Sequence, residues 1–213
     1  MNFNVFFGYK KRKTIFNNIN FEIKENKITV ICGHNGAGKT TLLKLVSGIL
    51  PSCIDTPTGW YVSASGGLIQ HFSLLEHLDM LGKNLKENEL VKYAYELFEA
   101  EKFEKEKVRY LSTGQIMMAS IILAIASTQN LLLLDEPFAS LDPIHAEKLS
   151  DLLKKITMTG RTIVITSHDL YLSAETADVV YFIKDGNISW NSLNENFEKF
   201  SVEELKEKYI EYA

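Results

Sequence analysis

The stretch GHNGAGKTT, residues 33–41, decides the fold. It fits the pattern G-x-x-x-x-G-K-[ST], follows the apolar run ITVIC at 28–32 and opens a helical pattern at 40–50. Glycines in such a loop let the backbone turn tightly, so that successive N–H groups face phosphate oxygens at a helix N-terminus. We therefore expect a phosphate-binding loop between a buried parallel strand and a helix.

The residue types within this loop predict separate tasks toward a nucleoside triphosphate. The Lys39 ammonium would reach the β- and γ-phosphates, and the Thr40 hydroxyl is placed to ligate Mg²⁺. A glycine turn that merely precedes a helix is the alternative, and the flanking strand and helix argue against it. The predicted ATP-binding residues are Gly33, His34, Asn35, Gly36, Ala37, Gly38, Lys39, Thr40 and Thr41.

A second acidic motif, LLLLDE at 131–136, provides the other half of such a site. Asp135 would end a buried strand and hold Mg²⁺ through water, and Glu136 would orient and deprotonate the attacking water. Two acidic residues in a solvated turn are the alternative reading. The phosphate loop upstream and the sequence PFASLD downstream favour the catalytic one.

The rest of the chain alternates between strand and helix patterns, which predicts an α/β fold with a mainly parallel sheet. An edge hairpin is expected at 179–190, and a capping box starts a tail helix at Ser201. Further strands are expected at 4–7, 19–23, 60–64 and 161–167, and further helices at 73–81, 87–100, 114–127 and 143–156.

Composition is that of an ordinary globular domain. The chain has 213 residues, 46% of them hydrophobic, with a net charge of −4. A mildly acidic chain argues against nucleic-acid binding, with the basic run at 10–13 read as a solvated turn. The apolar run at 116–127 is too short to span a bilayer. Cys32 and Cys53 make no disulfide framework, so a reducing compartment fits.

The chain resembles the ATP-binding subunits of ABC transporters in five motifs that keep that family's order and approximate spacing. They are GHNGAGKTT (33–41), LSTGQ (111–115), LLLLDEP (131–137), SLD (140–142) and TSH (166–168). The resemblance implies a P-loop NTPase fold of the ABC ATPase type, with a short antiparallel β part. It implies an ATP-binding domain at 1–190, a helical subdomain inserted at about 70–110, and a C-terminal helical tail at 191–213.

The same resemblance implies a role for the second small-residue turn. In the family two cassettes face head to tail, and the turn of one covers the nucleotide of the other. LSTGQ differs from the family's LSGGQ in having Thr113, and Ser112 also suits a plain helix N-cap. The turn residues expected to act on the partner's nucleotide are Ser112, Thr113, Gly114 and Gln115.

Three single residues carry over from the family by position. Tyr9 matches the aromatic residue that stacks on adenine. His168 matches the histidine that touches the γ-phosphate and stabilises the hydrolytic geometry. Asp142 matches the aspartate of the loop that crosses the dimer interface.

The sequence also departs from the family. Ala64 stands where a glutamine is usual, and either a water or the nearby Gln70 would have to replace it. The segment between Lys39 and Tyr61 is short, and the apolar residues at 116–118 lack the usual arginine. These departures concern the hydrolysis rate and its coupling more than nucleotide binding.

The resulting functional hypothesis is the ATPase subunit of a membrane transporter. It would use ATP and Mg²⁺, pair with a second ATP-binding subunit as a homodimer, and sit in the cytoplasm on the inner face of the cell membrane. Residues 66–82 would receive a coupling helix of a membrane-spanning partner, with Phe72, Leu74, Leu75 and Leu78 either lining this groove or packing in the core. The stretch SGGLIQHFSLLEHL resembles the corresponding segment of small export-type subunits, which favours export. A soluble ABC-type ATPase and a weakly hydrolysing ATP-binding regulator are the alternatives.

Overall fold

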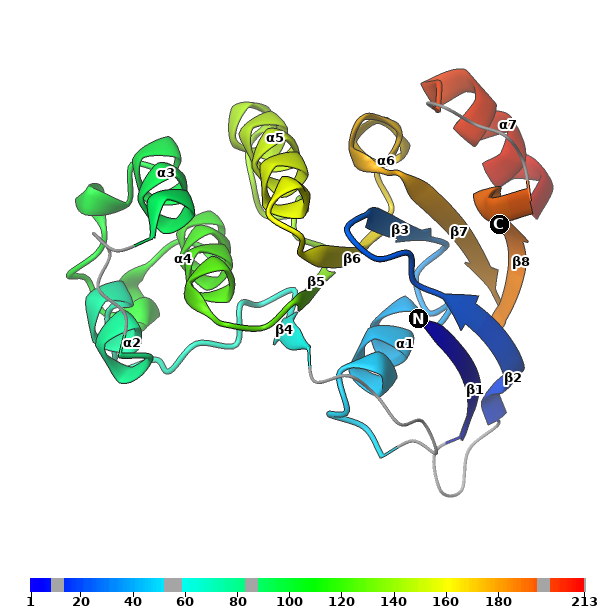
Figure 1. Ribbon diagram of the computed structural model, residues 1–213, viewed down its shortest axis with the longest axis horizontal. Coiled ribbons are helices and arrows are strands. Elements are labelled where there is room, and N and C mark those ends of the chain that lie inside the picture. The colour runs from blue at the N-terminus through cyan, green and yellow to red at the C-terminus, as the bar shows by residue number, and fades with distance from the viewer. Residues whose placement is uncertain (9–13, 52–58, 83–87, 195–199, 213) are drawn as a thin grey trace.

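The computed structural model describes residues 1–8, 14–51, 59–82, 88–194 and 200–212. Its main sheet has six strands in the order β4-β5-β6-β3-β7-β8 (Figure 1). All neighbouring strands are parallel except β7 and β8, which form the expected antiparallel hairpin. The strands are β3 (Ile28–Cys32), β4 (Trp60–Val62), β5 (Leu131–Asp135), β6 (Thr162–Ser167), β7 (Val179–Lys184) and β8 (Asn187–Asn191). The predicted mainly parallel α/β fold is confirmed.

A separate two-stranded antiparallel sheet comes from the start of the chain. It pairs β1 (Asn2–Gly8) with β2 (Thr14–Glu22). Both strands begin earlier than the alternation at 4–7 and 19–23 predicted, because the pairing continues through Phe3 and Phe16, which are buried. Tyr9 and the basic run at 10–13 lie outside the described residues, as does Cys53.

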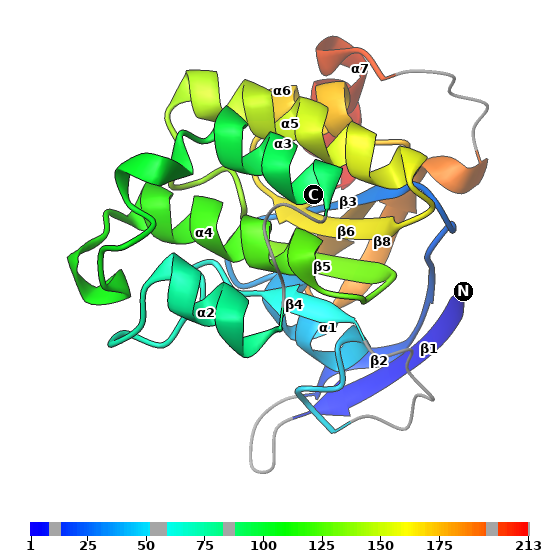
Figure 2. The same cartoon turned by 60° about the vertical axis from the view of Figure 1, so that its left-hand side comes forward.

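Helices cover both faces of the main sheet, and β3 shows why. Alternate strand residues point to opposite faces, so Val30 and Cys32 join one core cluster and Ile31 joins the other. The first cluster includes residues of α2 to α6, of which α3, α4 and α5 stack on one side in Figure 2. The second contains α1 and the β1–β2 sheet. The helices are α1 (Lys39–Val46), α2 (Leu74–Met80), α3 (Glu89–Leu97), α4 (Thr113–Ala126), α5 (Pro143–Met158), α6 (Leu170–Thr176) and α7 (Val202–Tyr212).

Most element ends differ by a few residues from the sequence prediction. The helix expected to reach 50 ends at Val46, because Gly48 adopts a positive φ of 75°. The helix expected at 87–100 ends at Leu97, and Glu99 then takes a left-handed conformation. The strand expected at 60–64 stops at Val62. The short helix α6, capped by Asp169, was not predicted.

Helix α4 is buried nearly all round, as its composition predicted. Residues from Met117 to Ala126 are all buried, and Arg161 donates hydrogen bonds to the carbonyls of Ala124, Ile125 and Ser127 at its C-terminal end. These contacts satisfy carbonyls that the helix itself leaves unpaired. Among the described residues, no helix combines the length and apolar character needed to cross a membrane.

The tail helix α7 starts with the predicted capping box. Ser201 Oγ accepts the Glu204 N–H at 3.1 Å, and Glu204 Oε2 accepts the Ser201 N–H at 2.9 Å. The helix packs against β7 through Tyr209, whose ring centroid lies 5.7 Å from that of Phe182. The tail is thus part of the first core cluster through Leu205.

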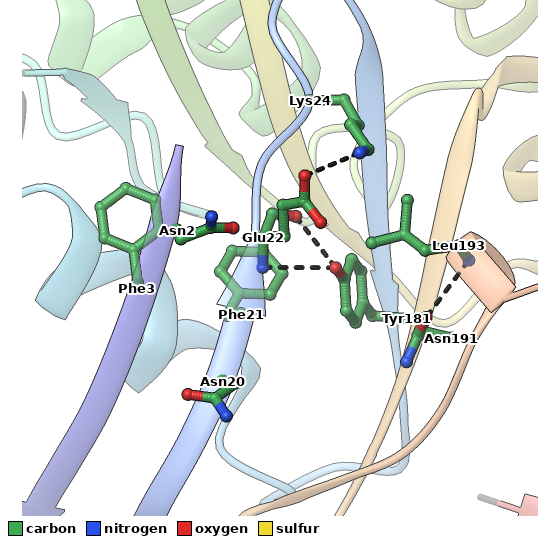
Figure 3. Close-up of a pocket in the computed structure, with 9 residues that line it drawn as sticks. All are labelled: Asn2, Phe3, Asn20, Phe21, Glu22, Lys24, Tyr181, Asn191 and Leu193. Atoms are coloured by element: carbon green, nitrogen blue, oxygen red, sulfur yellow. Dashed lines mark hydrogen bonds and ion pairs between the residues drawn. The ribbon is translucent and has the colours of Figure 1, made fainter.

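The two sheets are joined at a polar hollow of about 560 Å³ (Figure 3). The Tyr181 hydroxyl donates to the Glu22 carbonyl at 2.9 Å and accepts the Glu22 N–H at 3.3 Å. The Tyr181 ring packs edge-on against Phe21 at 4.8 Å, and burial raises the pKa of Tyr181 to about 12. The Tyr181 side chain of β7 therefore fixes the C-terminal end of β2 to the main sheet.

Replacing Tyr181 by phenylalanine is expected to lower the free energy of unfolding by about 1–2 kcal/mol, because both Glu22 backbone groups lose their partner. In a chain of this size the melting temperature should fall by about 2–8 °C. Tyr110→Phe is the control, since that side chain is 67% exposed. Equal melting temperatures for the two variants would contradict the anchoring role.

Candidate functional site

The predicted phosphate loop lies between β3 and α1, at the carboxyl end of the central strand. It opens onto a hollow of about 280 Å³ lined by Asn35, Gly36, Gly38, Lys39, Thr40, Thr41 and Glu136. Gly38 is the N-cap of α1 with a φ of 111°, a conformation that residues with a Cβ rarely adopt. The hollow beside Tyr181 is larger, but the ammonium in its described lining, that of Lys24, is paired with Glu22 at 2.7 Å, so the phosphate loop is the better site for phosphate.

Lys39 is almost buried at this site, with 6% of its surface exposed. Its Nζ donates to the carbonyl oxygens of Gly33 at 2.8 Å and His34 at 3.3 Å. The same nitrogen lies 3.5 Å from Glu136 Oε1. The ammonium therefore stands between the loop and the acidic end of β5.

The Asp135 carboxylate is held by three hydroxyl groups from three different elements. Oδ1 accepts from Thr40 Oγ1 at 3.0 Å and from Thr166 Oγ1 at 2.7 Å. Oδ2 accepts from Tyr61 Oη at 3.1 Å. Asp135 is 3% exposed, so these hydrogen bonds replace the water that a buried carboxylate loses. Thr40 and Asp135, the two predicted metal ligands, are in direct contact.

Glu136 adopts a left-handed backbone conformation with a φ of 50°. Its N–H donates to Thr166 Oγ1 at 2.9 Å, and its Oε2 lies 2.8 Å from His168 Nδ1. Since a carboxylate only accepts, Nδ1 carries the proton in this contact. A non-glycine residue in this region costs about 1–3 kcal/mol and is typical of functional sites. The Glu136 carboxylate lies between Lys39 and His168.

The residues present fit both a triphosphate and Mg²⁺. Magnesium in nucleotide sites is bound by one or two protein oxygens and by phosphate oxygens, rather than by a complete protein cage. The Thr40 hydroxyl and the Asp135 carboxylate offer such oxygens side by side. Among the described residues, no group of three or more histidine, cysteine, aspartate or glutamate side chains could hold a metal ion.

The LSTGQ turn forms the start of α4. Ser112 Oγ accepts the Gln115 N–H at 3.2 Å, and Gln115 Oε1 accepts the Ser112 N–H at 2.9 Å, so the N-cap reading is confirmed. A Cβ on Gly114 would lie 2.9 Å from the Ser140 carbonyl oxygen, so glycine is required there. Among the described residues that line the phosphate-loop hollow, none belongs to the turn at 111–115.

Asp142 is the N-cap of α5. Its Oδ1 accepts the N–H groups of Ile144 and His145, each at 3.1 Å, and its Oδ2 lies 2.6 Å from His145 Nδ1. The hydrogen bond from the His145 side chain lowers the pKa of Asp142. The residue is exposed together with its neighbour Ile144, which has 65% of its surface exposed.

The surface at 66–82 differs in part from the expectation. Leu74 and Leu78 are fully buried core residues, because they occupy the inner face of α2. Phe72 and Leu75 are half-buried. The exposed apolar side chains in this stretch are Ile69 and Met80, with 45% and 62% of their surfaces exposed, and the sequence analysis did not single them out.

Two residues at the site were missed by sequence reasoning, Tyr61 and Thr166. Ala64, at the position where a glutamine is usual, is exposed, and so is the nearby Gln70. The Gln70 backbone carbonyl accepts the Arg109 N–H at 3.1 Å. The contact from this part of the chain to Asp135 comes instead from the Tyr61 hydroxyl. Burial, followed by the negative charge of Asp135, raises the pKa of Tyr61 well above its usual range.

Comparisons with known proteins agree on one family. A family model described as "ABC transporter" matches residues 16–139. The chain is 32% identical over 209 residues to the energy-coupling factor transporter ATP-binding protein EcfA of Methanocaldococcus jannaschii, covering 86% of this chain and 75% of that protein. It is 30% identical over 216 residues to the manganese transport system ATP-binding protein MntB of Listeria monocytogenes, covering 91% and 90%.

A solved structure with the same fold shows the cassette as a pair. It is the dimeric structure of a post-hydrolysis state of the ATP-binding cassette MJ0796 bound to ADP and Pi. The TM-score is 0.79 at 24% identity, with 92% of this chain and 99% of that chain covered. At this level of identity the likeness shows the shared fold.

Proposed function

We propose that Glu136 is the general base and that a second copy completes each site. The premise is that this chain belongs to the ABC transporter family and is one of its ATP-binding ATPase subunits. The observation that supports this best is the position of Glu136. It contacts Lys39 on one side and His168 on the other, beside the phosphate-loop hollow.

Each side chain at the site has its own role in the proposed hydrolysis of ATP. Lys39 and the N–H groups of the loop bind and neutralise phosphate oxygens. Glu136 orients the attacking water and accepts its proton, and His168 holds the Glu136 carboxylate through Nδ1. When bound, MgATP supplies the phosphoanhydride bond that is broken and the metal charge that offsets the developing negative charge. Thr40 and Asp135 are the residues that would hold the metal.

The turn at 111–115 is proposed to bind the triphosphate held by a second copy. Its support is structural: it starts a 14-residue helix, its Ser112 and Thr113 are exposed, and it lies outside the hollow of its own chain. Small residues at such a helix N-terminus are suited to anions. The dimeric form of the related cassette MJ0796 is consistent with this arrangement.

The proposed partner outside the cassette is an integral membrane subunit, which would place the chain at the inner face of the membrane. The surface at 66–82 would receive it through Ile69 and Met80. The similarity to a manganese transport system protein and to an energy-coupling factor transporter protein gives the export direction no support. We therefore propose that ATP hydrolysis is coupled to transport, without assigning a direction.

Mixing two inactive variants tests whether the site is shared between copies. Lys39→Met removes the phosphate-binding ammonium, and Thr113→Glu places a carboxylate where the partner's phosphate is expected. Neither should hydrolyse ATP alone, whereas the mixture should regain up to about a quarter to a half of wild-type turnover per dimer, since one site of each mixed pair is intact.

The matched control is Thr113→Gln, which has the same size without the charge. It should keep most of the activity, and Thr113→Glu should remain folded because a carboxylate in the first turn of α4 is favourable. If the two inactive variants never complement each other although mixed dimers form, the shared site is wrong and each copy works alone.

A further inference from the structure

We infer that Tyr61 is a positioning residue for the metal site, because its hydroxyl fixes the orientation of the Asp135 carboxylate. The inference rests on the proposed function, since it assigns Asp135 to the metal. It concerns a residue on a strand that carries no motif, and it gives that strand a direct connection to the nucleotide site.

Strand register explains how Tyr61 reaches Asp135. In the parallel pair β4–β5, Tyr61 lies opposite Leu133. Asp135 is two residues further along β5, so it faces the same side of the sheet as Leu133. Diagonal neighbours of this kind are about 7–8 Å apart, a distance that a tyrosine side chain spans. The observed Oη to Oδ2 distance is 3.1 Å.

Thr166 approaches the same carboxylate from the other side. It lies directly opposite Asp135 in the register of β5 and β6, and its Oγ1 donates to Oδ1 at 2.7 Å. Asp135 is therefore the middle member of a row of side chains on three adjacent parallel strands. Its two outer neighbours, Tyr61 and Thr166, both contribute hydroxyl donors.

The hydrogen bonds that the Asp135 carboxylate accepts show which of its acceptor positions Tyr61 determines. A carboxylate has about four acceptor positions, two on each oxygen. Thr40 and Thr166 occupy both positions on Oδ1, and Tyr61 occupies one on Oδ2. Among the contacts of the described residues, one position on Oδ2 is left for a metal-bound water. Its direction is set by Tyr61, since Oδ2 has no other donor from the described part of the chain.

Tyr61 can act in this contact only as a donor. Its ring is partly buried against the cluster that contains α1, so the hydroxyl has a fixed approach to Oδ2. An ionised carboxylate only accepts hydrogen bonds, so the Tyr61 hydroxyl is the donor. Neither Ala64 nor Gln70 replaces this donor, because the Ala64 side chain has no polar group and the Gln70 side chain is exposed.

The test is the affinity of Mn²⁺, measured by electron paramagnetic resonance with the protein and a non-hydrolysable ATP analogue. Tyr61→Phe should weaken Mn²⁺ binding by about 3- to 10-fold, which corresponds to the loss of one hydrogen bond. Binding of the analogue in the absence of metal should change by less than about twofold, because Tyr61 does not line the phosphate hollow.

Tyr181→Phe is the matched control, because it removes a hydrogen-bonded tyrosine hydroxyl on β7 that does not contact Asp135. It should lower the melting temperature and leave Mn²⁺ affinity unchanged. If Tyr61→Phe binds Mn²⁺ as tightly as the wild type, the inference fails. If the wild type itself binds no Mn²⁺ with the analogue, the proposed function fails, so the two failures are distinguishable.

A double-mutant cycle locates the effect. In an Asp135→Asn background, Tyr61→Phe should have less than a twofold further effect on Mn²⁺ affinity, since the carboxylate it positions is gone. A full and independent effect in that background would mean that the hydroxyl acts elsewhere, and would overturn the assignment.

Discussion

Replacing Glu136 by glutamine should lower ATP turnover by about 10²–10⁴-fold while ATP binding is retained. Glutamine has nearly the same size, but its amide cannot accept a proton from water. The loop contacts of Lys39 with Gly33 and His34 do not depend on Glu136, so the phosphate-binding part of the site should stay intact. Turnover is measured by phosphate release and binding by a fluorescent ATP analogue.

The same variant should accumulate as an ATP-bound dimer, because closure on ATP would no longer be followed by hydrolysis. Light scattering with and without MgATP measures this directly. Glu203→Gln, an exposed position on α7, is the control and should behave like the wild type. Unchanged turnover in Glu136→Gln would show that the general base lies elsewhere, and a weakly hydrolysing regulator would show neither change.

Replacing Lys39 by methionine should weaken ATP binding by about 10- to 100-fold. A hydrogen bond from a charged donor contributes about 1.5–3 kcal/mol, and Lys39 has the one ammonium among the described residues that line the hollow. Methionine keeps most of the side-chain volume in a position that is only 6% exposed, so the loss should come from charge rather than from packing. Equilibrium dialysis with labelled ATP provides the dissociation constant.

Lys44→Met is the appropriate control, because it removes an ammonium from the last turn of the same helix, α1. It should leave ATP affinity within about twofold, since helix-end charges contribute only a few tenths of a kcal/mol. If Lys39→Met binds ATP as well as this control, then Lys39 serves only to close the loop through the carbonyls of Gly33 and His34.

Local patterns predicted the elements that carry the phosphate site. The loop at 33–41 and the acidic pair at 135 and 136 are each read from neighbouring residues, and the structure brings Thr40 and Asp135 into contact. Tyr61 and Thr166 were not predicted as partners of Asp135. Their contacts depend on the register of strands far apart in the sequence, and no pattern within a single strand encodes that register.

The same limit explains the surface at 66–82. Apolar spacing places Leu74 and Leu78 on one face of α2, but it does not say whether that face meets the core or a partner. The structure assigns it to the core. The helix α6 was missed because it has only seven residues, too few for a helical period to show, and helices of this length are stabilised mainly by tertiary packing.

The close approach of Gly114 to the Ser140 carbonyl has a mechanical consequence. Because Gly114 has no side chain, its backbone meets the Ser140 carbonyl directly. We therefore expect a displacement of residues 111–115 to press on the backbone at Ser140, two residues before Asp142.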